Sequence, residues 1–368
     1  MPVNLSNWRE APHNVWGFIH VEELLMTQPI WKGTSLKELP TGEHNAFDGF
    51  DVKSMNLMAL LDYTHTDGFI VLHKGKIIHE HYTNDNDASS KHIMFSMTKS
   101  VTGLIAGILH QEGKLDLKAE VKDYVAEVSR LYDGVTVQQC LDMQTGVKYD
   151  DNKHEYRAAC GWEPLDGSEK CKTLREFLQH VEAPVDETKG FNYCSVNTDL
   201  LGLVIEKVTN RKLPELIQEL LWQPMGADSN AAITIDSEGS PRAAGGMCAT
   251  LRDIARIGQL LTDSGRGIVP KSWIDEILNG GNDEKFTKGQ WSPAFKPSFE
   301  TPAYHNCWVT DPGTKTLVAL GVFGQQLMID LEHDIVMAKT SSQLTSSEFD
   351  KMMLGSAAFR EIQRILGV

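Results

Sequence analysis

The stretch Phe95-Ser96-Met97-Thr98-Lys99-Ser100 contains two side chains that can act together, one as a nucleophile and one as its base. A serine hydroxyl is a poor nucleophile until a base removes its proton, and a lysine is such a base only when it is uncharged. Burial lowers the pKa of a lysine because desolvation penalises the ammonium form. The sequence therefore predicts Ser96 as nucleophile and Lys99 as general base, provided that Lys99 is buried.

The residues that follow predict a helix that begins at Ser96. Apolar side chains recur at spacings of three and four, as on the buried face of an amphipathic helix, at Val101, Leu104, Ile105, Ile108 and Leu109. Lys99 lies one turn from Ser96 on the same side. A helix N-terminus offers free backbone N–H groups, so the Ser96 N–H is expected to stabilise an oxyanion. The alternative is a serine helix cap followed by a solvated lysine.

A second stretch, Phe191-Asn192-Tyr193-Cys194-Ser195-Val196-Asn197, precedes a predicted helix over residues 199–209, with Asn197 as its N-cap. Because Lys99 is committed to Ser96, the leaving group needs a separate proton donor. Tyr193 is the candidate, since a phenol acts as acid and base when a nearby cation lowers its pKa. The alternative is an aromatic side chain that packs on the core.

Composition and charge limit the class of protein. Of the 368 residues, 41% are hydrophobic and 23% charged, which is typical of globular proteins with a large core. The formal net charge of −15 argues against nucleic acid or an anionic membrane as partner, because phosphates require an excess of Lys and Arg. The six cysteines are dispersed without a Cys-x-x-Cys pair, so we expect no metal and no cofactor.

The sequence also carries expectations about location and partners. Residues 1–10 are polar and lack the basic and apolar regions of a secretory signal, and no apolar run is long enough to span a bilayer. We expect a cytoplasmic protein with reduced thiols that acts on a small molecule. Cys160 and Cys171 would be free to pair only if the chain were exported. Nothing in the sequence indicates an oligomeric state.

Two predicted lobes would position the motifs. A β-hairpin is predicted over residues 68–82, further strands towards the C-terminus, and a last helix over residues 349–366. The middle of the chain has helical periodicity. We therefore predict an α+β lobe made of residues 1–105 and 240–368, and a helical lobe made of residues 106–239.

These motifs in this order resemble the penicillin-recognising serine hydrolases of the class C β-lactamase type. Those enzymes carry Ser-x-x-Lys, then Tyr-x-Asn or Tyr-x-Ser, then a strand motif, Lys-Thr-Gly or His-x-Gly. Within that superfamily the sequence is most similar to the 6-aminohexanoate-dimer hydrolases and the related family VIII carboxylesterases. The resemblance covers nearly the whole chain and rests on the segments Asn7-Trp8, Pro12-His13-Asn14, Trp16-Gly17-Phe18, Leu141-Asp142-Met143-Gln144, Tyr193-Cys194-Ser195, Asn197-Thr198-Asp199 and Gly324-Gln325.

The resemblance implies a β-lactamase/transpeptidase-like fold of the α+β class. This fold has an antiparallel sheet flanked by helices, an inserted all-helical lobe, and the site in the cleft between them. The resemblance also implies that Ser96, Lys99 and Tyr193 are nucleophile, base and proton shuttle, with Ser195 supporting their hydrogen bonds. It further implies a substrate-binding tyrosine on a loop, for which we take Tyr156, with Tyr149 as the other choice.

The third motif departs from the β-lactamase pattern. It falls at Val322-Phe323-Gly324, and the backbone N–H of Gln325 is expected to complete the oxyanion hole beside Gly324. Lys315-Thr316-Leu317 lacks the glycine, and Lys339-Thr340-Ser341 falls in the next strand, so both are discounted. The lysine that receives a substrate carboxylate in β-lactamases is thus missing, which disfavours the hydrolysis of β-lactams.

The favoured hypothesis is a serine hydrolase that cleaves amide or ester bonds of a small linear substrate through an acyl-enzyme. One alternative is a β-lactamase or D-alanyl peptidase. An alternative of another class is a non-catalytic ligand-binding protein on the same scaffold, which the altered third motif favours. A Ser-His-Asp esterase is disfavoured because the sequence has no Gly-x-Ser-x-Gly elbow.

Overall fold

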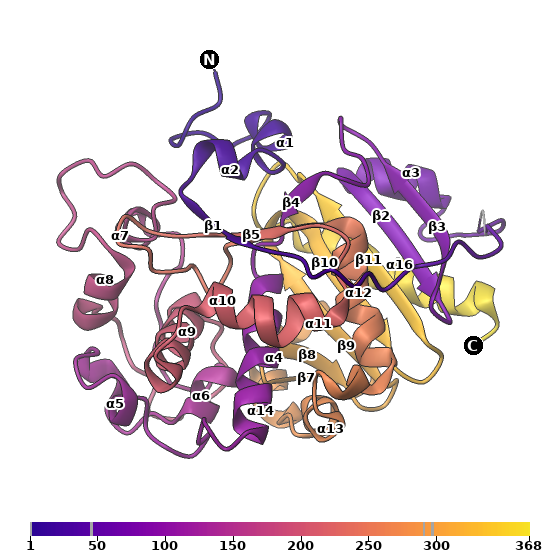
Figure 1. Cartoon of the computed structure of the whole chain (residues 1–368). Coiled ribbons are helices and arrows are strands. Elements are labelled where there is room, and N and C mark those ends of the chain that lie inside the picture. The colour runs from indigo at the N-terminus through magenta and orange to yellow at the C-terminus, as the bar shows by residue number, and fades with distance from the viewer. Residues whose placement is uncertain (1, 45–46, 290, 296–297) are drawn as a thin grey trace.

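The computed structural model describes residues 2–44, 47–289, 291–295 and 298–368. Its largest element is an antiparallel sheet of seven strands in the order β3-β2-β11-β10-β9-β8-β7 (Figure 1). Strand β2, near the N-terminus, pairs directly with β11, near the C-terminus, so the two ends of the chain build one sheet as predicted. The strands are β2 (Thr66–His73), β3 (Lys76–Tyr82), β7 (Ala303–His305), β8 (Trp308–Asp311), β9 (Thr316–Gly321), β10 (Gln325–Asp330) and β11 (Ile335–Ser341).

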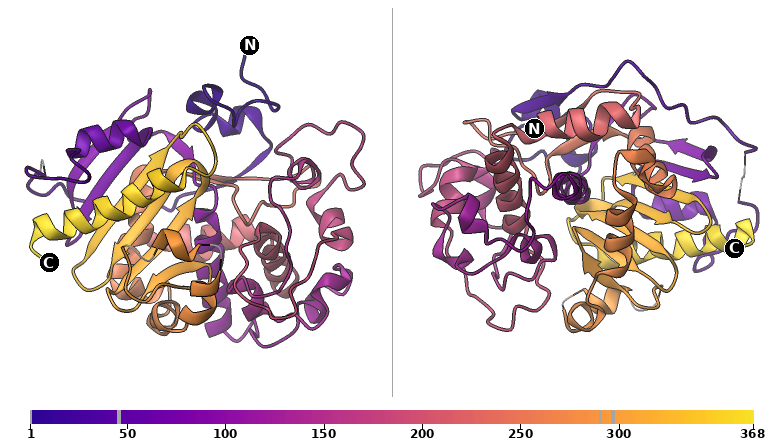
Figure 2. Two further views of the ribbon diagram at one scale, coloured as in Figure 1. Left: turned by 180° about the vertical axis from the view of Figure 1, so that it is seen from behind. Right: turned by 60° about the horizontal axis from the view of Figure 1, so that its bottom comes forward.

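Helices cover both faces of this sheet. Successive side chains of a strand point to opposite faces. Phe69 and Val71 belong to a core shared with α3 and α16, whereas Ile70 and Leu72 belong to the core that contains α12. Figure 2 shows α16 lying across one face. The helices of the part of the molecule that contains this sheet are α3 (Leu57–Tyr63), α12 (Leu251–Thr262), α13 (Lys271–Asn279), α14 (Asp283–Lys288), α15 (Ser292–Phe295) and α16 (Phe349–Leu366). Helix α16 has the predicted bounds.

A second, small sheet was not predicted. Its four strands follow the order β1-β5-β6-β4 and have the bounds Thr27–Ile30, Ala231–Thr234, Met247–Thr250 and Lys91–Ile93. Each strand has only three or four residues, which is too short for an alternating pattern to be recognised in the sequence. Strand β5 lies inside the stretch 106–239, which we expected to be entirely helical.

Short helices fill the rest of the middle of the chain (Figure 1). They are α5 (Val121–Tyr124), α6 (Val137–Leu141), α7 (His154–Ala159), α8 (Leu174–His180), α9 (Ser195–Thr209), α10 (Leu213–Ile217) and α11 (Gln223–Met225). Two more, α1 (His13–Gly17) and α2 (Val21–Leu24), lie near the N-terminus. Single turns of other helix types occur at Arg130–Tyr132, Gln218–Trp222, Ser264–Gly267 and Val322–Gly324.

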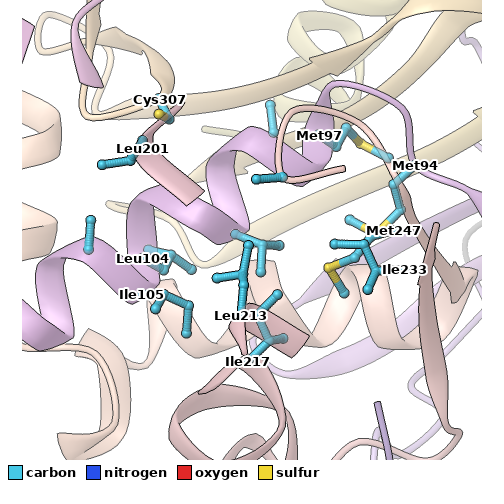
Figure 3. Packing of buried hydrophobic residues seen from close by; sticks show 14 of the residues in the cluster. Met94, Met97, Leu104, Ile105, Leu201, Leu213, Ile217, Ile233, Met247 and Cys307 are labelled. Atoms are coloured by element: carbon cyan, nitrogen blue, oxygen red, sulfur yellow. The ribbon is translucent and has the colours of Figure 1, made fainter. Parts of the chain in front are cut away.

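Helix α4 (Met97–Gln111) lies between the helical part and the sheet, and its residues are buried from Met97 to Leu109. Figure 2 shows this helix almost end-on between the two parts. Leu104 and Ile105 of α4 lie close to Leu213 and Ile217 of α10 (Figure 3). The predicted apolar helix is thus the element on which both parts pack, and its N-terminal end carries Ser96.

Two further expectations concern membranes and thiols. Across the described ranges, no helix is both long and apolar enough to cross a bilayer. All six cysteines are free and buried, so Cys160 and Cys171 form no disulfide.

Candidate active site

The N-terminal end of α4 brings Ser96 and Lys99 together. Lys99 Nζ lies 2.9 Å from Ser96 Oγ, 2.9 Å from Ser195 Oγ and 2.6 Å from the carbonyl oxygen of Ala244. The residue is 1% exposed. Burial lowers the pKa of Lys99 to about 8, although the nearby Asp151 carboxylate acts in the opposite direction. Ser96 makes no side-chain capping hydrogen bond, so the alternative of a capped helix with a solvated lysine is wrong.

The three contacts of Lys99 suit an uncharged amine. A neutral amine has two N–H donors and one lone pair. Donation to Ser195 Oγ and to the Ala244 carbonyl uses both N–H groups. The lone pair then faces the hydroxyl of Ser96, from which it can accept a proton.

Tyr193 lies against the same pair. Its hydroxyl shares a hydrogen bond with Ser96, and Lys99 Nζ is 4.9 Å from the centre of its ring. Trp291 lies on the ring with centroids 4.3 Å apart. Burial raises the pKa of Tyr193, and this effect exceeds the opposite effect of the Ser96 hydrogen bond. The Arg242 cation lowers the pKa of Tyr193 as expected, but burial outweighs it, so the phenol keeps its proton at neutral pH.

The loop after Tyr149 fixes the start of α9 and with it the position of Ser195. Both carboxylate oxygens of Asp151 accept from the Ser195 N–H, at 3.1 and 3.0 Å. A carboxylate is favourable at a helix N-terminus. Asn197, predicted as the N-cap, lies inside the helix, where its Oδ1 accepts from Tyr132 at 3.0 Å. The cap comes from a distant loop, and local sequence gives no signal for such a contact.

Tyr156 lies behind the site and not in it. It is fully buried, and its hydroxyl donates to Asp199 Oδ2 at 2.6 Å. Asp199 also pairs with Arg242, and its Oδ1 accepts from the Ala244 N–H at 2.8 Å. Tyr156 therefore supports the residue whose carbonyl holds Lys99. The structure corrects the expectation that Tyr156 contacts a substrate, because the side chain has no accessible surface.

The third motif forms the turn Val322–Gly324 between β9 and β10. The structure corrects the prediction that the backbone N–H of Gln325 completes the oxyanion hole. Gln325 is fully buried and pairs with Gly321 across the two strands. Its Nε2 donates to the carbonyls of Ser341 and Val322, at 2.6 and 3.2 Å. Among these residues Gly321, Val322 and Gly324 line the cavity that Ser96 borders, whereas Gln325 does not.

The turn lies directly against the segment that leads to Ser96. A Cβ on Gly321 would be 2.6 Å from the Met94 carbonyl oxygen, so a larger residue would not fit there. Gly324 has φ +93°, and Phe323 has φ +61°, a left-handed conformation that is unfavourable for a residue with a Cβ. The start of this turn is thus packed against the segment that leads to the nucleophile, and Gly321 and Val322 line the same cavity as Ser96.

Lys339, discounted in the sequence as a substrate contact, supports this turn from the interior. It is 2% exposed and donates to the Gly324 carbonyl at 3.2 Å and to the hydroxyl of Ser341. Burial lowers its pKa to about 7, more than the carboxylate of Asp67 raises it. Lys339 does not line the cavity at Ser96.

The cavity at Ser96 has a volume of about 640 Å³, which is in the range of small-molecule sites. One side is the loop that contains Tyr149 and Asp151, and the opposite residues come from the end of β9 and the start of α16. Tyr149, the other tyrosine considered in the sequence, lines this cavity. Its lining also includes Lys148, Asp150, Asn152, Asn192, Tyr193, Trp291, Leu320, Gln343, Ser346, Ser347, Glu348, Phe349 and Met352.

Comparison with known proteins identifies the family. The sequence model of the Beta-lactamase family matches residues 64–359. The chain belongs to the beta-lactamase family. It is 31% identical over 350 residues to the 6-aminohexanoate-dimer hydrolase of Paenarthrobacter ureafaciens, with 92% of this chain and 88% of that protein aligned.

Solved structures share the fold. A Bacillus anthracis structure assigned to the 6-aminohexanoate-dimer hydrolases has a TM-score of 0.89 and 27% identity, and the match covers 100% of this chain and 98% of that one. EstCE1, a hydrolase with promiscuous acyltransferase activity, has a TM-score of 0.62 and 16% identity, over 82% of this chain and 96% of its own. The predicted β-lactamase/transpeptidase-like fold is thereby confirmed. The chain is a hydrolase of this superfamily.

Proposed function

We propose that this protein is a cytoplasmic serine hydrolase that cleaves an amide or ester bond of a small linear substrate through an acyl-enzyme. The observation that carries the proposal is the buried Lys99 amine 2.9 Å from Ser96 Oγ. The Paenarthrobacter relative, whose name gives a 6-aminohexanoate dimer as substrate, supports a linear amide. Six free, buried cysteines suit a reducing compartment.

In the acylation step, the uncharged Lys99 takes the proton of Ser96, and Oγ attacks the substrate carbonyl. The negative charge that develops on the carbonyl oxygen needs backbone N–H groups placed in advance. We assign these to Ser96 and Val322, because Val322 lines the cavity beside Ser96 and Gln325 does not.

Tyr193 then donates its proton to the leaving amine or alcohol. Its raised pKa suits this role, because an acid must be protonated when the leaving group departs. Its hydrogen bond to Ser96 places the phenol at the reacting oxygen. In deacylation, the Tyr193 phenolate takes a proton from water, or Lys99 does so after it has passed the Ser96 proton to that phenolate. The resulting hydroxide attacks the acyl carbonyl, and the Lys99 ammonium returns a proton to Ser96 Oγ as the acid product leaves.

The proposal is tested with a fluorophosphonate probe and chromogenic substrates. We expect the probe to label wild type and the exposed-loop control Ser168→Ala, and to fail on Ser96→Ala. Wild type should hydrolyse p-nitrophenyl butyrate and butyryl p-nitroanilide and leave a chromogenic cephalosporin intact. Lack of labelling and turnover would favour the binding-protein alternative, and rapid cleavage of the cephalosporin would favour a β-lactamase.

A further inference from the structure

A second, smaller cavity of about 90 Å³ also borders Ser96 and Tyr193. Unlike the larger cavity, it has three guanidinium groups in its lining, those of Arg9, Arg157 and Arg242. The proposed reaction uses none of these arginines. Their side chains come from the N-terminal segment, from α7 and from the turn before β6, so the fold and not the local sequence gathers them.

Two of the three arginines have carboxylate partners. Arg242 pairs with the buried Asp199, and Arg157 Nη1 lies 3.2 Å from Glu163 Oε1. Among the described residues that line this cavity, only Asp151 carries a carboxylate, and both of its oxygens already accept from the Ser195 N–H.

Arg9 differs from the other two. Among the described residues it has no ion pair and no hydrogen bond, and its buried Nε has no partner. Its guanidinium lies beside two indoles that contact each other, 6.0 Å from the ring of Trp8 and 5.7 Å from that of Trp162. Burial and the nearby charges of Arg157 and Arg242 lower the pKa of Arg9 to about 9, and this effect exceeds the opposite effect of the Glu163 and Glu10 carboxylates.

Arg9 is half-buried, and a cation that is partly removed from water without an ion pair or a hydrogen bond is costly. A guanidinium matches a carboxylate in a bidentate geometry. Ser96 and Tyr193 border both cavities. A substrate whose scissile carbonyl carbon lies at Ser96 can therefore extend a separate anionic group into the smaller cavity.

We propose that this cavity is a subsite for a carboxylate carried by the substrate, with Arg9 as its principal ligand. The inference rests on the proposed function and names the class of substrate. A volume of 90 Å³ corresponds to about three water molecules, which leaves room for a carboxylate and a short linker. The substrate is therefore an amide or ester with a carboxylate one or two carbons from the scissile group. The N-terminal segment supplies the cation that the third motif lacks.

The test uses matched ester pairs that differ only in a carboxylate. In the first pair, mono-p-nitrophenyl succinate carries the carboxylate on the acyl side, and p-nitrophenyl butyrate is its neutral partner. In the second pair, carboxymethyl butyrate carries the carboxylate on the leaving-group side, and ethyl butyrate is its neutral partner. In wild type, kcat/KM for the acid should exceed that of its neutral partner in at least one pair. Arg9→Gln should reduce the ratio of kcat/KM for the acid to kcat/KM for its neutral partner at least tenfold, and Arg9→Lys should reduce this ratio less. The exposed Arg364→Gln should keep the wild-type ratio.

Binding to wild type keeps the inference testable if Arg9→Gln does not fold. Succinate should inhibit the hydrolysis of p-nitrophenyl butyrate competitively, whereas succinamide at equal concentration should not. Equal ratios in wild type and Arg9→Gln, or no inhibition by succinate, would overturn the subsite while esterase activity persists. If no ester is turned over, the proposed function fails, and calorimetric binding of succinate to Ser96→Ala then decides the subsite alone.

Discussion

Lys99 Nζ lies at the same distance, 2.9 Å, from the hydroxyl oxygens of Ser96 and Ser195. The two serines begin different helices, α4 and α9, so the amine joins the two parts of the molecule at the point where the nucleophile lies. One hydroxyl is the proposed proton source and the other an acceptor that orients the amine. The charge of Lys99 should therefore control the rate of hydrolysis.

The pH profile of a neutral ester tests the role of Lys99. Only the uncharged amine accepts the proton of Ser96, so kcat/KM for p-nitrophenyl butyrate should rise with pH and level off above about 8, the pKa of Lys99. Below that value the rate should fall about tenfold per pH unit. Lys99→Met should have no measurable turnover at any pH. A profile that is flat from pH 6 to 9 would contradict the assignment.

Replacement of Tyr193 by Phe should separate amides from esters. An amine leaves only after protonation, whereas a nitrophenolate leaves without it, so the loss of the phenol should affect amides more. We expect kcat/KM for butyryl p-nitroanilide to fall about 10²- to 10⁴-fold, and that for p-nitrophenyl butyrate much less. The exposed Tyr63→Phe is the matched control. Equal losses on both substrates would count against the proton-donor role.

Local patterns in the sequence predicted the parts of the site that local structure fixes. The helix after Ser96 and the hairpin β2–β3 have strong periodicity, and both are present with bounds close to those predicted. Burial of Lys99 was the condition on which its role as base depended, and the structure meets that condition. The family resemblance implied that Tyr193 acts with Ser96 and Lys99, and the structure brings the three side chains together.

The site residues that the sequence did not predict make contacts between distant segments of the chain. Asp151 caps α9, Arg9 reaches the site from the N-terminal segment, and Lys339 donates to a turn in the preceding hairpin. None of these contacts leaves a pattern within a sequence window. Tyr156 was preferred over Tyr149 for a similar reason, because only the packing decides which of two loop tyrosines faces Asp199 and which faces the cavity.

The two tyrosines should therefore respond differently to the same substitution. Tyr156→Phe removes a donor from the buried Asp199 carboxylate and should lower the free energy of unfolding by about 1–3 kcal/mol. Tyr149 lines the cavity, but its hydroxyl is buried and makes no hydrogen bond with the described residues, so Tyr149→Phe should leave both KM and stability nearly unchanged. Urea unfolding and steady-state kinetics on both variants measure this. A rise in KM without a loss of stability in Tyr156→Phe would restore Tyr156 as the substrate contact.

Replacement of Lys339 by Met should lower kcat and leave KM almost unchanged. Lys339 donates to the carbonyl of Gly324, and loss of this bond loosens the turn that presents the Val322 N–H to the oxyanion. We expect a decrease of about tenfold or more for p-nitrophenyl butyrate, a size typical of weakened oxyanion stabilisation. Lys315→Met, at the exposed lysine of the other discounted motif, is the control. A rise in KM at constant kcat would instead make Lys339 a substrate-binding residue.

The stability of the Lys339→Met variant should depend on pH in a predictable direction. Burial lowers the pKa of Lys339 from 10.5 to about 7, so between pH 7 and 9 the unfolded chain binds a proton that the native protein has largely released. This group therefore makes wild type more stable as pH rises through that range. Met cannot titrate, so the stability of the variant relative to wild type should fall by on the order of 2 kcal/mol from pH 7 to pH 9. Urea unfolding at both pH values measures the difference, and a constant difference would mean that Lys339 keeps its proton in the folded protein.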